Sequence, residues 1–225
     1  GGDNTIVGKD ALDACVTGAS NTAIGNNALG VYTGSQNTAV GFACMHSAST
    51  GAQNVAVGYY AGAGITTGGS NTALGFQALD VTTTASSNTA VGSSALGSNI
   101  TGGANTAVGS GALAANLASN NIAIGNDTLG ANTTGTENVA IGNDALKTAT
   151  TVSGNTAIGY RALEDCAVGE NTAIGDGAAR ETTTGTTNVA IGAYALLTNT
   201  TGGANVAVGK DALYSSTGGV NNVAV

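Results

Sequence analysis

The sequence contains no proline and no tryptophan, and only 8% of its 225 residues are charged. Glycine supplies 37 residues, a content that excludes a mainly helical protein because glycine destabilises helix interiors. A glycine-rich chain with few charges is compatible with disorder. However, hydrophobic residues make up 42% of this chain and recur at fixed intervals, which disorder does not require. These absences leave an ordered protein with little or no helix.

Several function classes also lack the residues they need. Neither a signal peptide, a transmembrane span nor a basic targeting segment is visible. The formal net charge of −8 opposes nucleic acid as a partner. His46 is the only histidine, and the glycine-rich segments recur without a following helix, unlike phosphate-binding loops. We therefore expect no enzyme activity, no cofactor, no metal site, no nucleic-acid binding and no membrane insertion.

A five-residue phrase recurs fourteen times along the chain at intervals of 16 or 17 residues. It reads Asn, a β-branched residue, Ala (Ile6 in the first copy), then Ile, Val or Leu, then Gly wherever the chain continues. A period this short and regular indicates a solenoid. We number the slots of each repeat from its Asn, which is slot one. The copies begin at Asn4, Asn21, Asn37, Asn54, Asn71, Asn88, Asn105, Asn121, Asn138, Asn155, Asn171, Asn188, Asn205 and Asn222.

The slots predict the course of one coil. Alternation within the phrase indicates a short β-strand, in which slots two and four share one face and slots one and three share the other. A second ladder follows at slots eight and nine, usually Ala-Leu as in Ala145-Leu146, and glycine-containing corners close the coil. The sequence therefore predicts an all-β fold, a parallel β-solenoid (β-roll) of about 14 coils with 16–17 residues each, forming a single repeat domain over residues 1–225.

The interior of such a coil is small, enclosing about one layer of side chains. We expect the Ile, Val and Leu residues of slot four to fill it, each stabilising the fold by roughly 1.5–3 kcal/mol. The small Ala and Gly residues would then form an exposed face. We expect other chains to cover that face.

The phrases Asn138–Gly142 and Asn188–Gly192, Asn-Val-Ala-Ile-Gly, resemble the head repeats of trimeric autotransporter (YadA-like) adhesins. The longer unit, with Ala-Leu and Thr-Thr-Gly after the phrase, is similar to repeats of phage tail-fibre proteins. The resemblance covers essentially the whole chain and implies a left-handed parallel β-roll with three chains in a fibre, intertwined or side by side. The adhesin repeat is shorter and usually carries Ser where this chain has the slot-eight Ala, which favours a phage fibre.

The resemblance leads to a structural fibre protein, a trimeric β-solenoid shaft or arm of a phage tail fibre involved in host attachment, located outside the cell at the virion surface. A bacterial surface adhesin or extracellular filament subunit is the alternative, and an ice-binding solenoid is a third. Val residues interrupt the Thr column of slot two and disfavour ice binding. The expected partners are further copies of the chain, as a homotrimer or an end-to-end filament, and a host surface glycan or protein receptor. Because the pattern is already running at Gly1 and stops at Val225, we expect a slice of a longer fibre.

Aromatic residues are the expected contacts with a receptor or glycan. Three of them occupy slot six in successive coils and should stack as a ridge. This ridge either stiffens the fibre and packs between chains, or offers a platform to a glycan. Six of the eight aromatic residues fall in slots six and seven: Phe42, Tyr59, Tyr60, Phe76, Tyr160 and Tyr194.

The remaining reactive residues have structural interpretations. Cys15, Cys44 and Cys166 lie too many coils apart for an intrachain disulfide. Cys44 replaces a ladder Ala and should be buried, whereas pairing between chains stays open for Cys15 and Cys166. Cys44-Met45-His46 fits a surface turn beside a core slot better than a nucleophile and base. The stacked slot-one Asn amides should hydrogen-bond along the solenoid axis.

Acidic residues lie mostly in the variable slots and corners. Asp127 and Asp144 occupy the same slot of adjacent coils, where we expect solvated carboxylates; a cation bridging them is the alternative.

Overall fold

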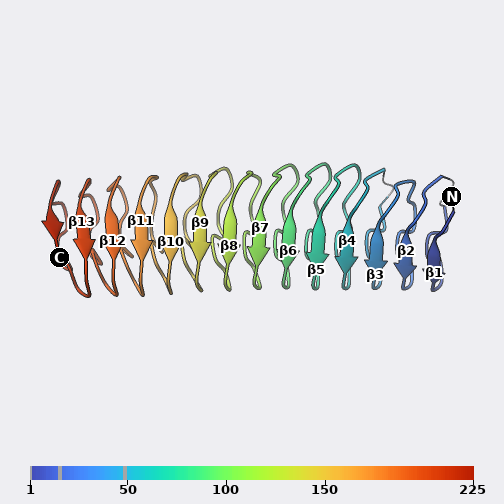
Figure 1. Cartoon of the computed structure of the whole chain (residues 1–225), viewed down its shortest axis with the longest axis horizontal. Helices are drawn as coiled ribbons and strands as arrows, with labels where there is room; N and C mark the ends of the chain where they lie inside the picture. Colours follow the sequence, from blue (N-terminus) through green and yellow to red (C-terminus); the bar gives the residue numbers. More distant parts are fainter. Residues whose placement is uncertain (1, 15–16, 48–49) are drawn as a thin grey trace. The chain divides into compact units, whose positions relative to one another are not determined.

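The computed structural model describes residues 2–14, 17–47 and 50–225, and it confirms the all-β solenoid. The described chain contains fourteen short strands and no helix, in two compact units, residues 1–117 with β1 to β7 and residues 118–225 with β8 to β14. Within each unit the strands run side by side in the same direction (Figure 1). The strands are β1 (Thr5–Val7), β2 (Thr22–Ile24), β3 (Thr38–Val40), β4 (Val55–Val57), β5 (Thr72–Leu74), β6 (Thr89–Val91), β7 (Thr106–Val108), β8 (Ile122–Ile124), β9 (Val139–Ile141), β10 (Thr156–Ile158), β11 (Thr172–Ile174), β12 (Val189–Ile191), β13 (Val206–Val208) and β14 (Val223–Ala224).

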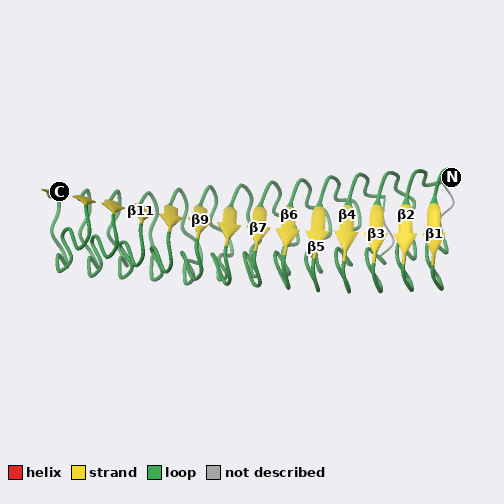
Figure 2. Ribbon diagram, turned by 60° about the horizontal axis from the view of Figure 1, so that its bottom comes forward, coloured by secondary structure: helices red, strands yellow, loops and turns green. Residues whose placement is uncertain are grey.

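Neighbouring strands pair slot against slot. Ala157 of β10 lies opposite Ala140 of β9, and the same register holds at the other strand pairs within each unit. Hydrogen bonds between coils continue beyond the strands, as where the Leu146 amide donates to the Ala162 carbonyl at 3.0 Å. The loops therefore repeat the same path from strand to strand (Figure 2). The regular period of the sequence is thus a regular period of backbone hydrogen bonds.

The structure reverses one expectation, the choice of the inner face. The Ala side chains of slot three are buried, Ala140 completely, whereas slot-four residues such as Ile174 and Ile191 point outward and are each 37% exposed. The expected pairing of slots was correct, but the wrong pair was placed inside. The physical reason is the narrow coil, because its interior beside the strand is filled by the Leu of slot nine and leaves room only for Ala and Asn.

The Leu ladder of slot nine forms the larger part of the core. Leu96, Leu129 and Leu146 are completely buried, and so is Met45 in the same slot. These residues have positive φ, 50° at Leu146 and 48° at Met45. Such a turn aims the side chain back into the coil. Because β-branched residues resist this conformation, slot nine uses Leu rather than Ile or Val.

The Asn ladder of slot one is hydrogen-bonded, as expected, but it is buried with the slot-three Ala rather than exposed. The Asn138 side chain donates through Nδ2 to Asn121 Oδ1 at 3.2 Å and to the Val152 carbonyl at 2.7 Å. Its Oδ1 accepts from the backbone N–H and the side-chain Nδ2 of Asn155, at 3.1 and 3.3 Å. Each amide therefore joins its own corner to both neighbouring coils, which satisfies backbone groups that the short strands leave unpaired.

Glycine at slot five is required by close approach of the coils. Gly142 has φ of +129°, and a Cβ placed there would lie 2.4 Å from the Gly159 carbonyl oxygen of the next coil. No side chain fits at that distance, and a slot-five glycine of positive φ begins the turn after each of β1 to β13. Within the described residues, no helix has the length and apolar character needed to span a membrane.

Candidate ligand-contact site

The turn after each strand displays the residues of slots six and seven. The slot-five glycine ends the strand, and the slot-seven residue adopts positive φ, 54° at both Tyr60 and Gln77. The slot-six side chain consequently lies on the outside, where Tyr59 is 48% exposed. Because the coils are in register, equal slots of consecutive coils stand next to one another. Residues that share slot six in consecutive coils therefore lie side by side on the surface.

The expected aromatic ridge is present in the first unit. The Phe42 and Tyr59 rings stack with centroids 5.3 Å apart and planes 11° apart, and Tyr59 and Phe76 stack at 5.5 Å and 6°. We call these three residues the aromatic ridge. Offset stacking at such distances stabilises aromatic pairs beyond the burial of their area. The ridge was predicted correctly from its shared slot.

Tyr60 extends this cluster sideways. Its ring lies 4.7 Å from the Tyr59 ring at an angle of 52°, and the His46 ring meets it edge-on at 5.5 Å. His46 Nδ1 also lies 3.2 Å from the Ala43 carbonyl oxygen. Tyr60 therefore adds an inclined ring beside the ridge, whereas both faces of the Tyr59 ring are stacked against Phe42 and Phe76.

A groove of about 610 Å³ begins at Tyr59 and Tyr60 and crosses the coils of β3, β4 and β5. We call it the β4 groove. On its polar side Gln77 Nε2 donates to Asp80 Oδ2 at 3.3 Å. Partial burial raises the pKa of the Asp80 carboxyl, while His46 and the hydrogen bond from Gln77 act in the opposite direction. Its lining includes His46, Tyr59, Tyr60, Ala63, Gly64, Gln77 and Asp80.

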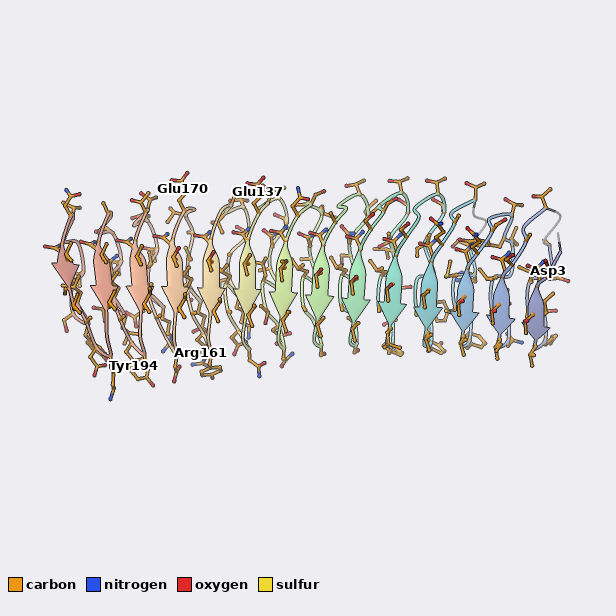
Figure 3. All side chains as sticks on the ribbon, in the orientation of Figure 1. Asp3, Glu137, Arg161, Glu170 and Tyr194 are labelled. Atoms are coloured by element: carbon orange, nitrogen blue, oxygen red, sulfur yellow. The ribbon has the colours of Figure 1, made fainter. Side chains whose placement is uncertain are left out.

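The other two predicted aromatic residues lie in the second unit and do not join a cluster of rings. Tyr160 has the Arg161 guanidinium carbon 4.9 Å from its ring centroid, and the Tyr194 hydroxyl donates to Asp176 Oδ2 at 3.3 Å. The Asp176 carboxylate raises the pKa of Tyr194. Figure 3 shows Arg161 and Tyr194 at the corner opposite the one that carries Glu137 and Glu170. The structure thus separates the six predicted contacts into a group of four and two isolated tyrosines.

Cys44 and Cys166, the two cysteines in the described part of the chain, are both buried and free. Cys44 is completely buried as expected, and burial raises the pKa of its thiol to about 12. The single thiol hydrogen can be donated to the carbonyl of Ala56 or of Ala61, whose oxygens lie 3.1 and 3.3 Å from the sulfur, and a protonated thiol is a poor nucleophile. Cys166 is buried too, and its pKa is raised by the same cause. The expectation of pairing through Cys15 falls outside the described residues.

Asp127 and Asp144, in the turns that follow β8 and β9, form ion pairs with Lys147 of the same chain. Lys147 Nζ lies 2.8 Å from Asp144 Oδ1 and 3.9 Å from Asp127 Oδ2. The ion pairs continue along the coils, from Asp144 to Arg161 at 3.8 Å and from Glu164 to Arg180 at 2.9 Å. Because these side chains are partly exposed, each pair contributes little to stability. Asp127, Asp144 and Glu164 therefore form part of a surface network of both signs.

The residues of the β4 groove other than the tyrosines were not identified from the sequence. The signal lies in slots ten and eleven, where the coil of β4 has Ala63-Gly64 between His46-Ser47 and Asp80-Val81 of its neighbours. A pair of small residues flanked on both sides by larger ones marks a hollow, once the register of the coils is known.

Comparison of the chain with protein-family models, with curated proteins and with solved structures found no match. The function of this chain is therefore inferred from its own residues and their arrangement.

Proposed function

We propose that this chain is a structural fibre protein, a β-solenoid shaft or arm of a phage tail fibre that assembles as a homotrimer and takes part in host attachment at the virion surface. The outward face of the strands carries this proposal. We call slots two and four of the strands the strand face.

The strand face carries no charge in either unit, and its slot-four column is apolar. Slot two holds only Thr, Val or Ile, and slot four only Val, Ile or Leu. Ile24 and Leu74 of the first unit are 37% and 46% exposed, and the slot-four residues of β11 and β12 are similarly exposed. Contiguous apolar surface of this kind marks an interaction site in soluble proteins.

A second copy of the same chain is the partner that best fits the strand face. Stacked parallel strands repeat about every 4.8 Å, so an identical face presents Ile and Val columns with a matching period. The charges that give the chain its net −8 lie outside slots two and four. Copies can therefore approach through the strand face without bringing like charges together.

The attachment role rests on the repeat phrase and on the exposed aromatic cluster. The Asn-Thr-Ala-Ile-Gly phrase with its following Ala-Leu ladder is similar to phage tail-fibre repeats. A solenoid built from such units gains length by adding coils, because each coil contacts only its neighbours. Exposed aromatic rings on such a support are suited to contact with a receptor.

The mass of the native assembly tests this proposal first. We expect light scattering to give three times 21.3 kDa and electron micrographs to show rod-shaped particles. A monomer of 21.3 kDa at micromolar concentration would contradict the homotrimer and with it the fibre.

A pair of charge variants tests which face is used. Ile174→Glu with Ile191→Glu places two carboxylates on the strand face, where both side chains already point outward. We expect a folded monomer with the circular dichroism of the parent. Thr184→Glu with Thr201→Glu is the matched control, because these exposed residues lie in the same two coils outside the strands. The control should stay trimeric; loss of the trimer in both pairs would contradict assembly through the strand face.

A further inference from the structure

The β4 groove arises from an irregularity in one coil. Every neighbouring coil places Leu or Met in slot nine, but the coil of β4 has Gly62, and the side chain of Ile65 fills the space instead. A Cβ on Gly62 would lie 3.0 Å from Ile65 Cδ1, which shows how closely Ile65 occupies that position. The core is thus preserved while the surface above it is altered.

The floor of the groove consists of small residues held in place by packing. Ala63 and Gly64 occupy the slots in which the coils on either side carry His46-Ser47 and Asp80-Val81. A Cβ on Gly64 would lie 2.7 Å from the Asp80 carbonyl oxygen, so only glycine fits the close approach of the two coils. The floor of the groove is therefore fixed by the close approach of the backbones at Gly64.

The two sides of the groove differ in chemistry. On one side lie the Tyr60 ring and the edge of the Tyr59 ring, whose two faces are stacked against Phe42 and Phe76. On the other side Gln77 and Asp80 supply an amide and a carboxylate that are hydrogen-bonded to each other. A pyranose sugar has the matching surface, an apolar C–H face that stacks on aromatic rings and a rim of hydroxyls. Those hydroxyls donate to a carboxylate and accept from an amide. A volume of about 610 Å³ lies within the range of small-molecule sites.

Charge selects among sugars. The lining contains no lysine or arginine, and its acidic residue is Asp80. An anionic sugar would meet that carboxylate and the net negative charge of the chain without a lysine or arginine in the lining to offset either. Burial already disfavours the ionised form of Asp80 and raises its pKa, so hydroxyl donors from a ligand would offset part of that cost.

We propose that the β4 groove is a binding site for a neutral pyranose-containing oligosaccharide, which stacks on Tyr60, contacts the edge of the Tyr59 ring and hydrogen-bonds to Asp80 and Gln77. This inference rests on the proposed role in attachment and names the chemical class of the partner. None of the lining residues belongs to slot two or four, so the groove stays accessible when copies associate through the strand face.

The test uses the whole chain and a defined set of sugars. Immobilised chitotriose, maltotriose, cellotriose, mannotriose and globotriose are probed together with 3′-sialyllactose, and the best neutral ligand is then titrated calorimetrically. We expect binding to at least one neutral trisaccharide and much weaker binding to the sialylated one. Absence of binding to every neutral sugar, or preference for the sialylated one, would overturn the proposal.

Four variants locate the bound sugar. Tyr59→Ala removes a ring edge that lines the groove and the ring against which Tyr60 packs at 4.7 Å. Ala63→Leu fills the groove with the residue that Leu197 provides in the same slot of another coil. Each should weaken binding by about tenfold or more. Phe76→Ala shortens the aromatic ridge outside the groove and should leave affinity nearly unchanged. Tyr160→Ala is the matched control, since Tyr160 shares the slot and the 48% exposure of Tyr59 in the other unit.

Unchanged affinity in both groove variants, or equal loss in the Tyr160 control, would show that the sugar binds elsewhere and overturn the proposal. The melting temperature of each variant is measured alongside, and Ala63→Leu keeps the test decisive if Tyr59→Ala is unstable. Light scattering on the same samples separates the two proposals. A trimer that binds no neutral sugar would contradict the sugar site but not the trimeric fibre. A monomer that binds a neutral sugar would contradict the trimeric fibre but not the sugar site.

Discussion

Leu146 has φ of 50°, and its neighbours along the ladder of slot nine share this left-handed conformation from Leu12 to Leu213. The residues found there are Leu, Met, Ala and Gly, and none is β-branched. Left-handed backbone costs about 1–2 kcal/mol for an ordinary L-residue. The solenoid offsets that cost because the turn buries the Leu side chain, whose burial stabilises by roughly 1.5–3 kcal/mol.

At the residue scale, this conformation predicts that Leu146→Ile destabilises the fold by about 2 kcal/mol or more although the side-chain volume is conserved. Leu146→Met should cost less than about 1.5 kcal/mol, because Met is unbranched at Cβ and Met45 already occupies the slot. Denaturant midpoints of the two variants check the prediction. Equal losses would mean that backbone conformation does not select the residue at slot nine.

At the scale of the element, neighbouring coils are joined mainly by hydrogen bonds of the backbone and of the slot-one Asn side chains. Strands of two or three residues make few ladder bonds, and the buried Asn column adds side-chain bonds at each corner. Asn138 both donates to and accepts from its neighbours, so a missing amide leaves groups unpaired in two coils. A buried unpaired polar group costs about 1–3 kcal/mol.

Asn138→Ala should therefore destabilise the second unit by about 3 kcal/mol or more, because the Val152 carbonyl and the Asn155 amide lose their partner. Val139→Thr is the control, since Thr occupies the adjacent slot two in eight of the fourteen copies. Its midpoint should change by less than about 1 kcal/mol. A small effect of Asn138→Ala would show that water replaces the amide at this corner.

At the scale of the whole molecule, each unit contains one described buried thiol, Cys44 in the first and Cys166 in the second. Burial raises the pKa of both, to about 12 for Cys44 against the ordinary 9.0. A raised thiol pKa favours the folded state while the thiol is neutral. That stabilisation is complete below pH 9 and is lost as the pH rises toward 12.

The reactivity of these two thiols reports local unfolding in each unit. In a Cys15→Ser background, native protein at pH 8 should react slowly with a disulfide reagent, and denatured protein should react at two thiols. Because coils contact only their neighbours, Asn138→Ala should accelerate labelling of Cys166 more than that of Cys44. Peptide mass mapping of the labelled sites measures this. Equal acceleration at both thiols would indicate that the two units open as one.

The sequence by itself determined the β-solenoid, the length of its coils and the register that stacks Phe42, Tyr59 and Phe76, since a repeated slot must recur at a repeated place in space. Alternation also showed which slots share a face, but it could not show which face is inside. Only the tertiary structure decided that, because the narrow interior, already filled by the Leu ladder, admits Ala140 and excludes the larger Ile141. The β4 groove likewise needs three coils in contact, since small residues form a hollow only where larger neighbours stand on both sides.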